Sequence, residues 1–349
     1  MDDIRKRYGV DKVYPLDANE TPLGPSPQVI TAVQQAATEL GLYPPMGDET
    51  LRQAIVETLG RGLTIDNIFT GCSGYEALEL LTRAYLEPGD EVIVHPPTFG
   101  VFAKITRLER AKVVAVALER PSFSLDVEAV LAAITARTRL IILCNPNNPT
   151  GTITTAAQMQ YLMAHLPDHV ILITDEVYHD FVTRADYPDS LAYVLNGRNL
   201  VVIHSFAKAY GLPGLRLGYG IAPPPIADHV GGLHRGFHQN RLALAAGIAA
   251  LGDPAHMQRV VAVTLAGKQW LYEQLEALPV RYWHSETNFV LVETAVAGSD
   301  AVEHLRHFGV LVKAFPGELD NCIRVTVGLP EANERFIEGL AALVQKGGA

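Results

Sequence analysis

Short, nearly continuous apolar runs alternate with helix-like stretches between residues 65 and 236. The clearest apolar runs cover residues 113–118, 140–143, 170–173 and 200–203. Strands that are apolar at almost every position are typical of sheets covered on both faces, and strands that alternate with helices form mostly parallel sheets. The pattern therefore predicts an α/β region built on a mainly parallel sheet covered by helices.

The pattern changes on either side of this region. The first forty residues are expected to be loop-like apart from a helix over 28–40, because residues 16–27 hold three prolines and a glycine. A long helical stretch over 241–277 is broken near Gly252, and two short strands and a last helix follow it. We therefore predict a large domain over residues 41–236, and a small α+β domain made of residues 1–40 and 237–349.

Polar side chains follow the last three of these apolar runs, at the point where each predicted strand ends. Asn148 lies in the turn after the second run, Asp175 and Tyr178 follow the third, and Lys208 follows the fourth. Ligands of such sheets bind beyond the carboxyl ends of the strands. We therefore expect these side chains to converge on one site.

Lys208 stands just beyond a predicted buried strand, and two interpretations are open. A lysine in a loop is most often a solvated surface charge. A lysine in a dry pocket instead has a lowered pKa, which suits Schiff-base chemistry. In that case Ser205 and Arg216 supply a hydroxyl and a guanidinium for a phosphate group.

A second candidate for binding a phosphate is the predicted turn over residues 71–74, at the start of a helix. Backbone N–H groups at such a helix start favour an anion. Ser73 and Glu76 also fit a capping box, which uses some of the same N–H groups. The sequence leaves this competition open.

The composition excludes several classes of function. The chain has 349 residues, 48% of them apolar and 19% charged, with a net charge of −10 and no basic run. Nucleic acid and acidic membrane surfaces are therefore not expected partners. The N-terminus has no secretory pattern, no apolar run reaches the ~20 residues of a bilayer span, and the three distant cysteines show no metal-ligand spacing. We expect a cytoplasmic protein without a metal site.

The residues at the strand ends suit pyridoxal phosphate, an aldehyde cofactor that acts as an electron sink. Its ring nitrogen needs a carboxylate such as Asp175, although a turn or helix-capping aspartate is an equal alternative. Its ring hydroxyl needs hydrogen-bond donors, for which Asn148 and Tyr178 are placed. Phe99, after another predicted strand, either stacks on the ring or packs in the core.

Arg324 lies on a predicted strand between apolar neighbours. A buried arginine is uncommon unless it is paired. Because its guanidinium binds carboxylate and phosphate groups with two parallel hydrogen bonds, the anionic end of a substrate is a natural partner.

Four motifs in this order resemble the class I/II aminotransferases of fold type I: NPNNPTG at 145–151, DEVYHDF at 175–181, SFAKAYGLPGLRLGYG at 205–220 and CIRVTVG at 322–328. The histidinol-phosphate aminotransferase branch looks closest. NETPLGPSP at 19–27, YPPMGDETLR at 43–52, SETNFVLV at 285–292 and KAFPG at 313–317 match its layout. The resemblance covers nearly the whole chain.

The resemblance implies a fold and a set of roles. The fold is a seven-stranded, mainly parallel sheet with one antiparallel strand, plus the small domain. Lys208 forms the imine with pyridoxal phosphate and moves the substrate proton, and Asp175 pairs with the pyridine nitrogen. The other implied cofactor contacts are Asn148 and Tyr178 at the ring hydroxyl, Phe99 against the ring, and Ser73, Gly74, Tyr75, Ser205 and Arg216 at the phosphate.

The resemblance also implies contacts to substrate and to a second subunit. Arg324 binds the anionic end of the substrate. Tyr43 reaches the phosphate in the other subunit, so a homodimer is expected. Asn19 is a candidate substrate contact, with a simple turn asparagine as the alternative.

Several positions depart from the family pattern. GCSGYE replaces the usual GxGSDE, His204 and Ala207 replace arginine and serine of an RTFSK segment, GFHQN replaces PFNVN, and Lys313 stands where arginine is frequent. None of these changes touches Lys208, Asp175, Asn148, Tyr178, Arg216 or Arg324. They bear on the substrate more than on the cofactor.

We therefore expect an aminotransferase that moves an amino group from a small anionic donor to a 2-oxo acid by a ping-pong mechanism. L-Histidinol phosphate and 2-oxoglutarate are the preferred pair. One alternative is a pyridoxal-phosphate decarboxylase of the threonine-phosphate type, or another lyase or cyclase. Another is a transcription regulator with an aminotransferase-like domain, which the net negative charge and the lack of a DNA-binding segment disfavour.

Overall fold

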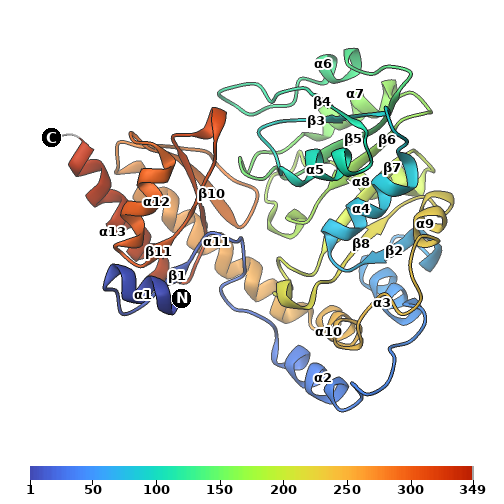
Figure 1. The fold of residues 1–349 in the computed structure, drawn as a ribbon, viewed down its shortest axis with the longest axis horizontal. Coiled ribbons are helices and arrows are strands. Elements are labelled where there is room, and N and C mark those ends of the chain that lie inside the picture. Colours follow the sequence, from blue (N-terminus) through green and yellow to red (C-terminus); the bar gives the residue numbers. More distant parts are fainter. Residues whose placement is uncertain (348–349) are drawn as a thin grey trace.

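A seven-stranded sheet forms the centre of the larger part of the molecule (Figure 1). The structure is a computed structural model and describes residues 1–347. The strand order is β2-β8-β7-β6-β5-β3-β4. The strands are β2 (Ile68–Gly71), β3 (Glu91–Val94), β4 (Lys112–Ala115), β5 (Thr138–Cys144), β6 (Ile171–Asp175), β7 (Leu200–Ser205) and β8 (Gly218–Ile221).

Only β8 runs antiparallel to its neighbours in this sheet, and the other pairs are parallel. The predicted fold class, a mainly parallel seven-stranded sheet with one antiparallel strand, is confirmed. The four apolar runs found in the sequence correspond to β4, β5, β6 and β7.

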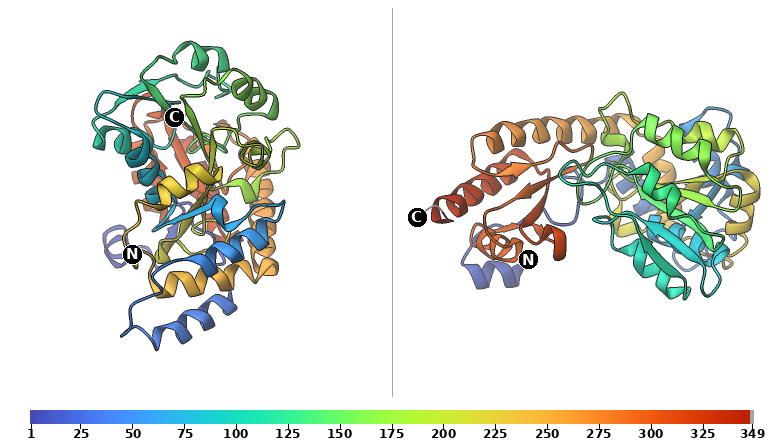
Figure 2. Two further views of the ribbon diagram at one scale, coloured as in Figure 1. Left: turned by 90° about the vertical axis from the view of Figure 1, so that its right-hand side faces the viewer. Right: turned by 90° about the horizontal axis from the view of Figure 1, so that it is seen from above.

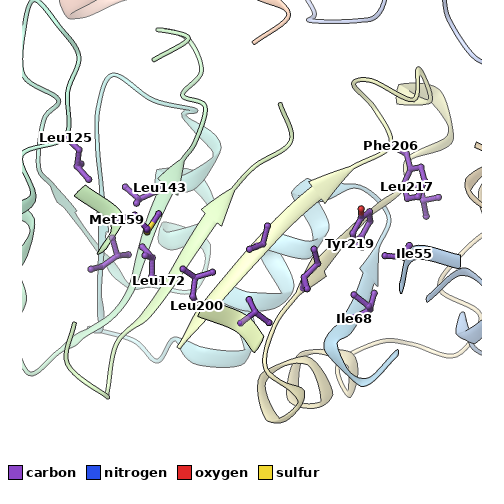
Figure 3. Close-up of a cluster of buried hydrophobic side chains, with 14 of the residues drawn as sticks. Ile55, Ile68, Leu125, Leu143, Met159, Leu172, Leu200, Phe206, Leu217 and Tyr219 are labelled. Atoms are coloured by element: carbon purple, nitrogen blue, oxygen red, sulfur yellow. The ribbon is translucent and has the colours of Figure 1, made fainter. Parts of the chain in front are cut away.

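Both faces of the central strands β5, β6 and β7 are buried, while the edge strand β4 is partly exposed. Alternate residues of a strand point to opposite sides of the sheet. Leu200 and Val202 of β7 belong to one apolar cluster, and Val201 and Ile203 belong to the other. Figure 3 shows the first cluster, where side chains from neighbouring strands lie on one face of the sheet. This arrangement explains the near-continuous apolar runs.

Helices cover the two faces. The face of Val201 is covered by α4 (Gly74–Tyr85), α5 (Val101–Leu108) and α9 (Pro224–Gly231). The face of Leu200 is covered by α3 (Glu49–Leu59), α6 (Val127–Ala132), α7 (Ala156–His165), α8 (Ser190–Leu195) and α10 (Arg241–Leu251).

The smaller part is built on a four-stranded antiparallel sheet of order β12-β13-β10-β9, next to a two-stranded parallel pair. The sheet strands are β9 (Arg281–Tyr282), β10 (Phe289–Glu293), β12 (Lys313–Ala314) and β13 (Cys322–Thr326), and the pair is β1 (Tyr14–Pro15) with β11 (Val310–Leu311). The helices are α1 (Asp2–Tyr8), α11 (Pro254–Glu276), α12 (Gly298–Arg306) and α13 (Pro330–Gly347).

Short 3-10 helices occur in both parts of the molecule: η1 (Ile65–Asn67), η2 (His179–Phe181), η3 (Pro213–Leu215) and η4 (Gly317–Leu319).

The alternation of β13 directs one arginine toward the large sheet. Ile323 and Val325 belong to the apolar core of the small part, together with Val290 and Val292 of β10. Arg324 therefore lies on the opposite face of the strand. The sequence analysis predicted that this arginine is buried and binds an anionic group.

The division between the two parts is visible in Figure 1 and in the right-hand view of Figure 2. α11 runs from the edge of the large part into the small part. α10 packs against α2 (Pro27–Ala37) and α3, and Ala243 and Ala246 belong to the core of the large sheet. This packing favours a division near Gly252; the predicted boundary at 236/237 stays a prediction.

The N-terminal arm contains a helix that the sequence analysis missed. None of the residues of α1 is buried, and the helix ends at Gly9 in the left-handed conformation. A short helix without an apolar face gives no periodic signal. The turn-rich segment that follows α1 and β1 carries Asn19 to the boundary between the two parts.

Candidate active site

The predicted polar residues converge where β5, β6 and β7 end. Cys144 of β5 lies beside Asp175 of β6, and Asp175 lies beside Ile203 of β7. Because these strands are parallel and in step, the segments that follow them meet at one edge of the sheet. They enclose a cavity of about 280 Å³. Twelve predicted residues line it: Asn19, Ser73, Gly74, Tyr75, Phe99, Asn148, Asp175, Tyr178, Ser205, Lys208, Arg216 and Arg324.

Lys208 lies in the turn after β7, at the side of the cavity. Ser205 begins this turn, and its Oγ accepts a hydrogen bond from the N–H of Ala207 at 3.1 Å. The amine Nζ of Lys208 donates to the backbone oxygen of Asn19 at 3.3 Å and lies 5.4 Å from the centre of the Tyr178 ring. Burial, followed by the nearby guanidinium of Arg324, lowers the pKa of Lys208 to about 8. A fraction of this amine is therefore neutral at neutral pH, unlike a surface lysine.

Asp175 is a buried carboxylate at the end of β6, with 3% of its surface exposed. Its side chain accepts one hydrogen bond among the described residues, from the N–H of Val177 at 3.4 Å. Burial raises the pKa of Asp175 to about 7, although the hydrogen bond and Lys208 oppose the shift. A carboxylate in this setting gains stability from a cationic N–H group placed in the cavity.

Tyr178 and Asn148 both keep donor groups available for the cavity. The Tyr178 hydroxyl accepts from Nδ2 of Asn19 at 2.8 Å, so its own proton is left to be donated. Oδ1 of Asn148 accepts from Arg324 at 2.6 Å, which turns the Nδ2 donors of Asn148 away from the guanidinium. Both residues line the same cavity, so their donors are available to a ring hydroxyl or hydroxylate placed there.

The first turn of α4 forms the corner of the cavity that suits an anion. Ser73 precedes α4, and its Oγ accepts from the N–H of Glu76 at 3.4 Å. Glu76 does not complete the expected capping box, because its carboxylate accepts from the N–H of Cys72 instead of that of Ser73. The N–H groups of Gly74 and Tyr75 belong to the helix start, where they have no intrahelical partner.

A glycine on β8 makes this corner possible. A Cβ atom on Gly218 would lie 2.2 Å from the backbone nitrogen of Gly74. Only a glycine lets β8 approach the first turn of α4 this closely. Arg216, two residues earlier, has a left-handed backbone with φ of 55° and lines the cavity next to this turn.

Arg324 is 7% exposed and has neutral partners. Its Nη1 donates to Asn148, its Nη2 donates to the backbone oxygen of Asp17 at 2.6 Å, and its Nε has no hydrogen-bond partner among the described residues. The rings of Phe289 and Phe315 lie 5.1 and 5.7 Å from its guanidinium carbon. Burial lowers the pKa of Arg324 from its usual value. A buried cation without a carboxylate partner favours an anionic ligand.

Phe99 lines the cavity and packs edge-on against Phe102, with ring centres 5.7 Å apart. It also lines an adjoining cavity of about 760 Å³ between the two parts of the molecule. Arg324, Asn148 and Phe99 border both cavities, and Lys313 and Glu318 border only the second. The two cavities thus share one wall.

Tyr43 does not line either cavity. It is 79% exposed and stacks on Phe237, with ring centres 4.9 Å apart. Its predicted role requires a second subunit, so the role and the homodimer stay predictions.

Two residues that the sequence analysis did not assign also bear on the site. Asn288, directly before β10, and Thr326, at the end of β13, both bond to Asn19. The segment that contains Asn288 was noticed as a motif, but the sequence alone gave it no contact. No group of three or more His, Cys, Asp or Glu side chains within residues 1–347 could hold a metal ion.

Comparisons with known proteins agree with this geometry. The family model "Aminotransferase class I and II" matches residues 11–340. The chain belongs to this family. It is 37% identical to a histidinol-phosphate aminotransferase of Moorella thermoacetica, over 99% of this chain and 89% of that protein, and 37% identical to histidinol-phosphate aminotransferase 1 of Nitrosococcus oceani, over 99% and 93%.

A solved structure gives the same result for the fold. The chain is similar to histidinol-phosphate aminotransferase from Sinorhizobium meliloti in complex with pyridoxal-5'-phosphate, with a TM-score of 0.90, 26% identity, and coverage of 99% of this chain and 94% of that one. The predictions of the family, of fold type I and of a pyridoxal-phosphate-dependent aminotransferase are confirmed at the level of the family.

Proposed function

We propose that this aminotransferase transfers the amino group of L-histidinol phosphate to 2-oxoglutarate by a ping-pong mechanism. The observation that carries the proposal is the 280 Å³ cavity, which brings together the amine of Lys208, the buried carboxylate of Asp175 and the guanidinium of Arg324. The amine and the carboxylate suit the cofactor, and the guanidinium suits the substrate.

The residues present fit pyridoxal phosphate. Asp175 would meet the ring N–H, a cation that offsets the cost of burying this carboxylate. Tyr178 and Asn148 would donate to the ring hydroxyl, and Phe99 would lie against the ring. The phosphate would take the first turn of α4 at Ser73, Gly74 and Tyr75, together with Ser205 and Arg216. When bound, the cofactor supplies the electron sink for breaking the Cα–H bond of the substrate.

Lys208 is the group of this chain that moves protons. Its pKa near 8 leaves part of the amine neutral at neutral pH, so it is able to accept a proton from the substrate Cα and return it. The hydrogen bond to Asn19 and the ring of Tyr178 limit where the amine lies. Loss of the amine therefore removes both the covalent attachment and the proton transfer.

Arg324 selects anionic substrates. Arg324 borders both cavities, and each of its Nη groups has a second N–H beyond the one that bonds to Asn148 or Asp17. The larger cavity has room for a side chain, and Lys313 on its wall adds a second cation. An amino donor with a phosphate group and a 2-oxo acid with a second carboxylate would both place an anionic group against Arg324. The curated relatives named for histidinol phosphate support this donor.

The proposal includes a homodimer in which Tyr43 reaches the cofactor phosphate in the partner. Its support is the exposed position of Tyr43 and Phe237, which place an aromatic pair on the surface. In the part of the chain that the structure describes, no helix is long and apolar enough to cross a membrane. A cytoplasmic location stays a prediction.

The test is the visible absorption spectrum of the cofactor-loaded protein during titration with L-histidinol phosphate. We expect the band of the lysine-bound cofactor to disappear and 2-oxoglutarate to restore it. A band that this donor leaves unchanged while another amino acid removes it would reject the substrate. Carbon dioxide release from threonine phosphate without an oxo acid would favour the decarboxylase, and retention of DNA in a gel shift would favour the regulator.

Two variants support this measurement. Lys208→Ala should lose the band and turnover, while Lys112→Ala, an exposed lysine on β4, should keep both. Substantial turnover in Lys208→Ala would falsify the assignment of the reactive lysine.

A further inference from the structure

Asn19 is held in one position by contacts from both parts of the molecule. Its backbone has φ of 56°, and its side chain is 2% exposed. Its N–H donates to Oγ1 of Thr326 at 3.0 Å, and its Nδ2 donates to the hydroxyl of Tyr178 at 2.8 Å. Asparagine is among the few residues that adopt a positive φ readily. The direction of the Asn19 carbonyl is therefore fixed by the fold.

That carbonyl receives two donors. One is Nζ of Lys208 at 3.3 Å, and the other is Nδ2 of Asn288 at 3.0 Å. Asn288 directly precedes β10 on the small sheet, while Lys208 follows β7 on the large sheet. One oxygen atom thus connects the small sheet to the lysine amine.

The bond to Asn19 is the one side-chain hydrogen bond of Asn288 among the described residues. The residue is 1% exposed, and its Oδ1 has no hydrogen-bond partner among the described residues. A buried polar atom without a partner costs stability, so an apolar side chain would suit this position better if packing were its only role. The carbonyl acceptor also decides the orientation of the amide, because a reversed amide would place two oxygen atoms against each other.

We propose that Asn288 is a positioning residue for Lys208, acting through the backbone carbonyl of Asn19. The inference rests on the proposed role of Lys208 as the reactive amine. Asn288 does not line the cavity, so it touches neither substrate nor cofactor. Its amide holds the oxygen that receives the amine, and shares that oxygen with it.

The shared oxygen affects the charge of the amine in a defined direction. The carbonyl oxygen of Asn19 carries a partial negative charge that stabilises the ammonium form of Lys208. The positive end of the Asn288 N–H dipole points to the same oxygen and offsets part of that charge. Asn288 therefore favours the neutral amine. The other charged groups around Lys208 are Arg324 and Arg216, which lower its pKa, and Asp175 and Glu20, which raise it. None of these four is changed by a substitution at Asn288.

The test measures the basicity of Lys208 in the cofactor-free protein. The rate of acylation of Lys208 by acetic anhydride is followed against pH, by mass spectrometry of its peptide, in wild type, Asn288→Ala and Asn288→Leu. Leucine branches at Cγ into two terminal heavy atoms as asparagine does, so it removes the donor and keeps the outline of the side chain, whereas alanine removes the donor without adding volume. We expect the apparent pKa of Lys208 to rise by about half a unit in both variants, the size of one neutral hydrogen bond.

The control is Asn333→Ala. Asn333 is another buried asparagine of the small part, and its side chain bonds only to Gly328 among the described residues. Asn333→Ala should lower thermal stability and leave the pH dependence of Lys208 acylation unchanged. Unchanged or lowered apparent pKa values in both Asn288 variants would overturn the proposal.

The kinetics of the cofactor-loaded enzyme give a second readout. We expect kcat to fall in Asn288→Leu and KM for the amino donor to stay constant, because the residue acts on the proton transfer and not on substrate binding. A raised KM with constant kcat would contradict the proposal. If instead wild-type Lys208 acylates with the profile of a surface lysine, the proposed role of Lys208 fails before that of Asn288 is judged.

Discussion

Arg324 of the small sheet donates a hydrogen bond to the side-chain oxygen of Asn148, on the turn after β5 of the large sheet, at 2.6 Å. The bond joins the residue proposed for the anionic end of the substrate to a residue proposed for the cofactor ring. It also leaves Nε of Arg324 without a partner among the described residues. The guanidinium is thus oriented before a substrate arrives, and each Nη group, which makes one hydrogen bond among the described residues, has a second N–H to offer to that substrate.

The first prediction concerns Arg324→Ala. The variant should lose about 3–4 kcal/mol of transition-state stabilisation, or roughly 10²–10³ in kcat/KM for 2-oxoglutarate, because a charged contact with two hydrogen bonds is removed. The kcat/KM of Arg324→Lys for 2-oxoglutarate should lie between those of wild type and Arg324→Ala, because lysine keeps the positive charge but cannot make two parallel hydrogen bonds to a carboxylate.

Steady-state kinetics with both substrates measure this effect. Arg335→Ala, a change in a surface arginine of α13 that pairs with Glu338, is the control and should behave as wild type. An Arg324→Ala variant with unchanged kcat/KM for 2-oxoglutarate would remove Arg324 from the substrate site.

The second prediction concerns Gly218→Ala. The added Cβ would meet the nitrogen of Gly74 at 2.2 Å, so β8 and the first turn of α4 must separate. This should weaken binding of pyridoxal phosphate by about tenfold or more, which corresponds to 1.4 kcal/mol, in addition to a loss of stability from overpacking.

Fluorescence titration of the cofactor-free protein with pyridoxal phosphate gives the dissociation constant. Gly214→Ala is the matched control, because nothing lies within 4 Å of its added Cβ. Equal dissociation constants for the two variants would show that the corner at Gly74 does not hold the phosphate.

Much of this site was predictable because buried parallel strands leave a strong signal. β5, β6 and β7 are apolar along almost their whole length, so their ends, and the polar residues that follow, were located from the sequence. Their convergence then follows from the geometry of a parallel sheet. Lys208, Asp175 and Asn148 were found in this way.

Other features depend on contacts between segments that are far apart in the chain. The bond from Asn288 to Asn19 joins residues 269 positions apart, and no local pattern encodes such a pair. The partner of Glu76 changed for a local reason: Ser73 has φ of 106°, and its N–H donates to Gly71 rather than to Glu76. The packing of α10 on the large sheet could not be predicted from the sequence either, because the pattern of an apolar helix does not indicate which core it packs against.

The third prediction concerns the dimer. Tyr43→Ala and Lys208→Ala chains should be unfolded, mixed and refolded together. The activity of this mixture should exceed the average activity of the two variants refolded separately. In a mixed dimer one site has an intact Lys208 from one chain and an intact Tyr43 from the other. Random mixing would restore about a quarter of the wild-type sites, since half of the dimers are mixed and each has one complete site.

Turnover of the mixture against the two variants alone measures this recovery. Lys208→Ala mixed with Lys112→Ala and refolded in the same way serves as the reference for refolding yield, because half of its sites should be complete however the chains pair. If the mixture of Tyr43→Ala and Lys208→Ala only averages its components, each site is built from a single chain.

The fourth prediction concerns the pH dependence of stability in the cofactor-free protein. Burial raises the pKa of Asp175 from 3.8 to about 7. The folded state therefore holds a proton that the unfolded state releases between pH 4 and pH 7, so this group makes folding less favourable as pH rises through that window. Asp175→Asn should remove a share of about 2–4 kcal/mol from the difference in unfolding free energy between pH 4.5 and pH 7.5.

Urea unfolding at the two pH values measures this share. Burial also raises the pKa of Glu176 to about 7, so Glu176→Gln should remove a separate share and is the matched control. Lys208, with a pKa lowered to about 8, carries a constant charge over most of this window and changes the result little. Loading wild type with pyridoxal phosphate should reduce its pH dependence as Asp175→Asn does, because a ring cation beside Asp175 lowers the pKa of that carboxylate. If loading leaves the pH dependence as it was, Asp175 does not face the ring nitrogen.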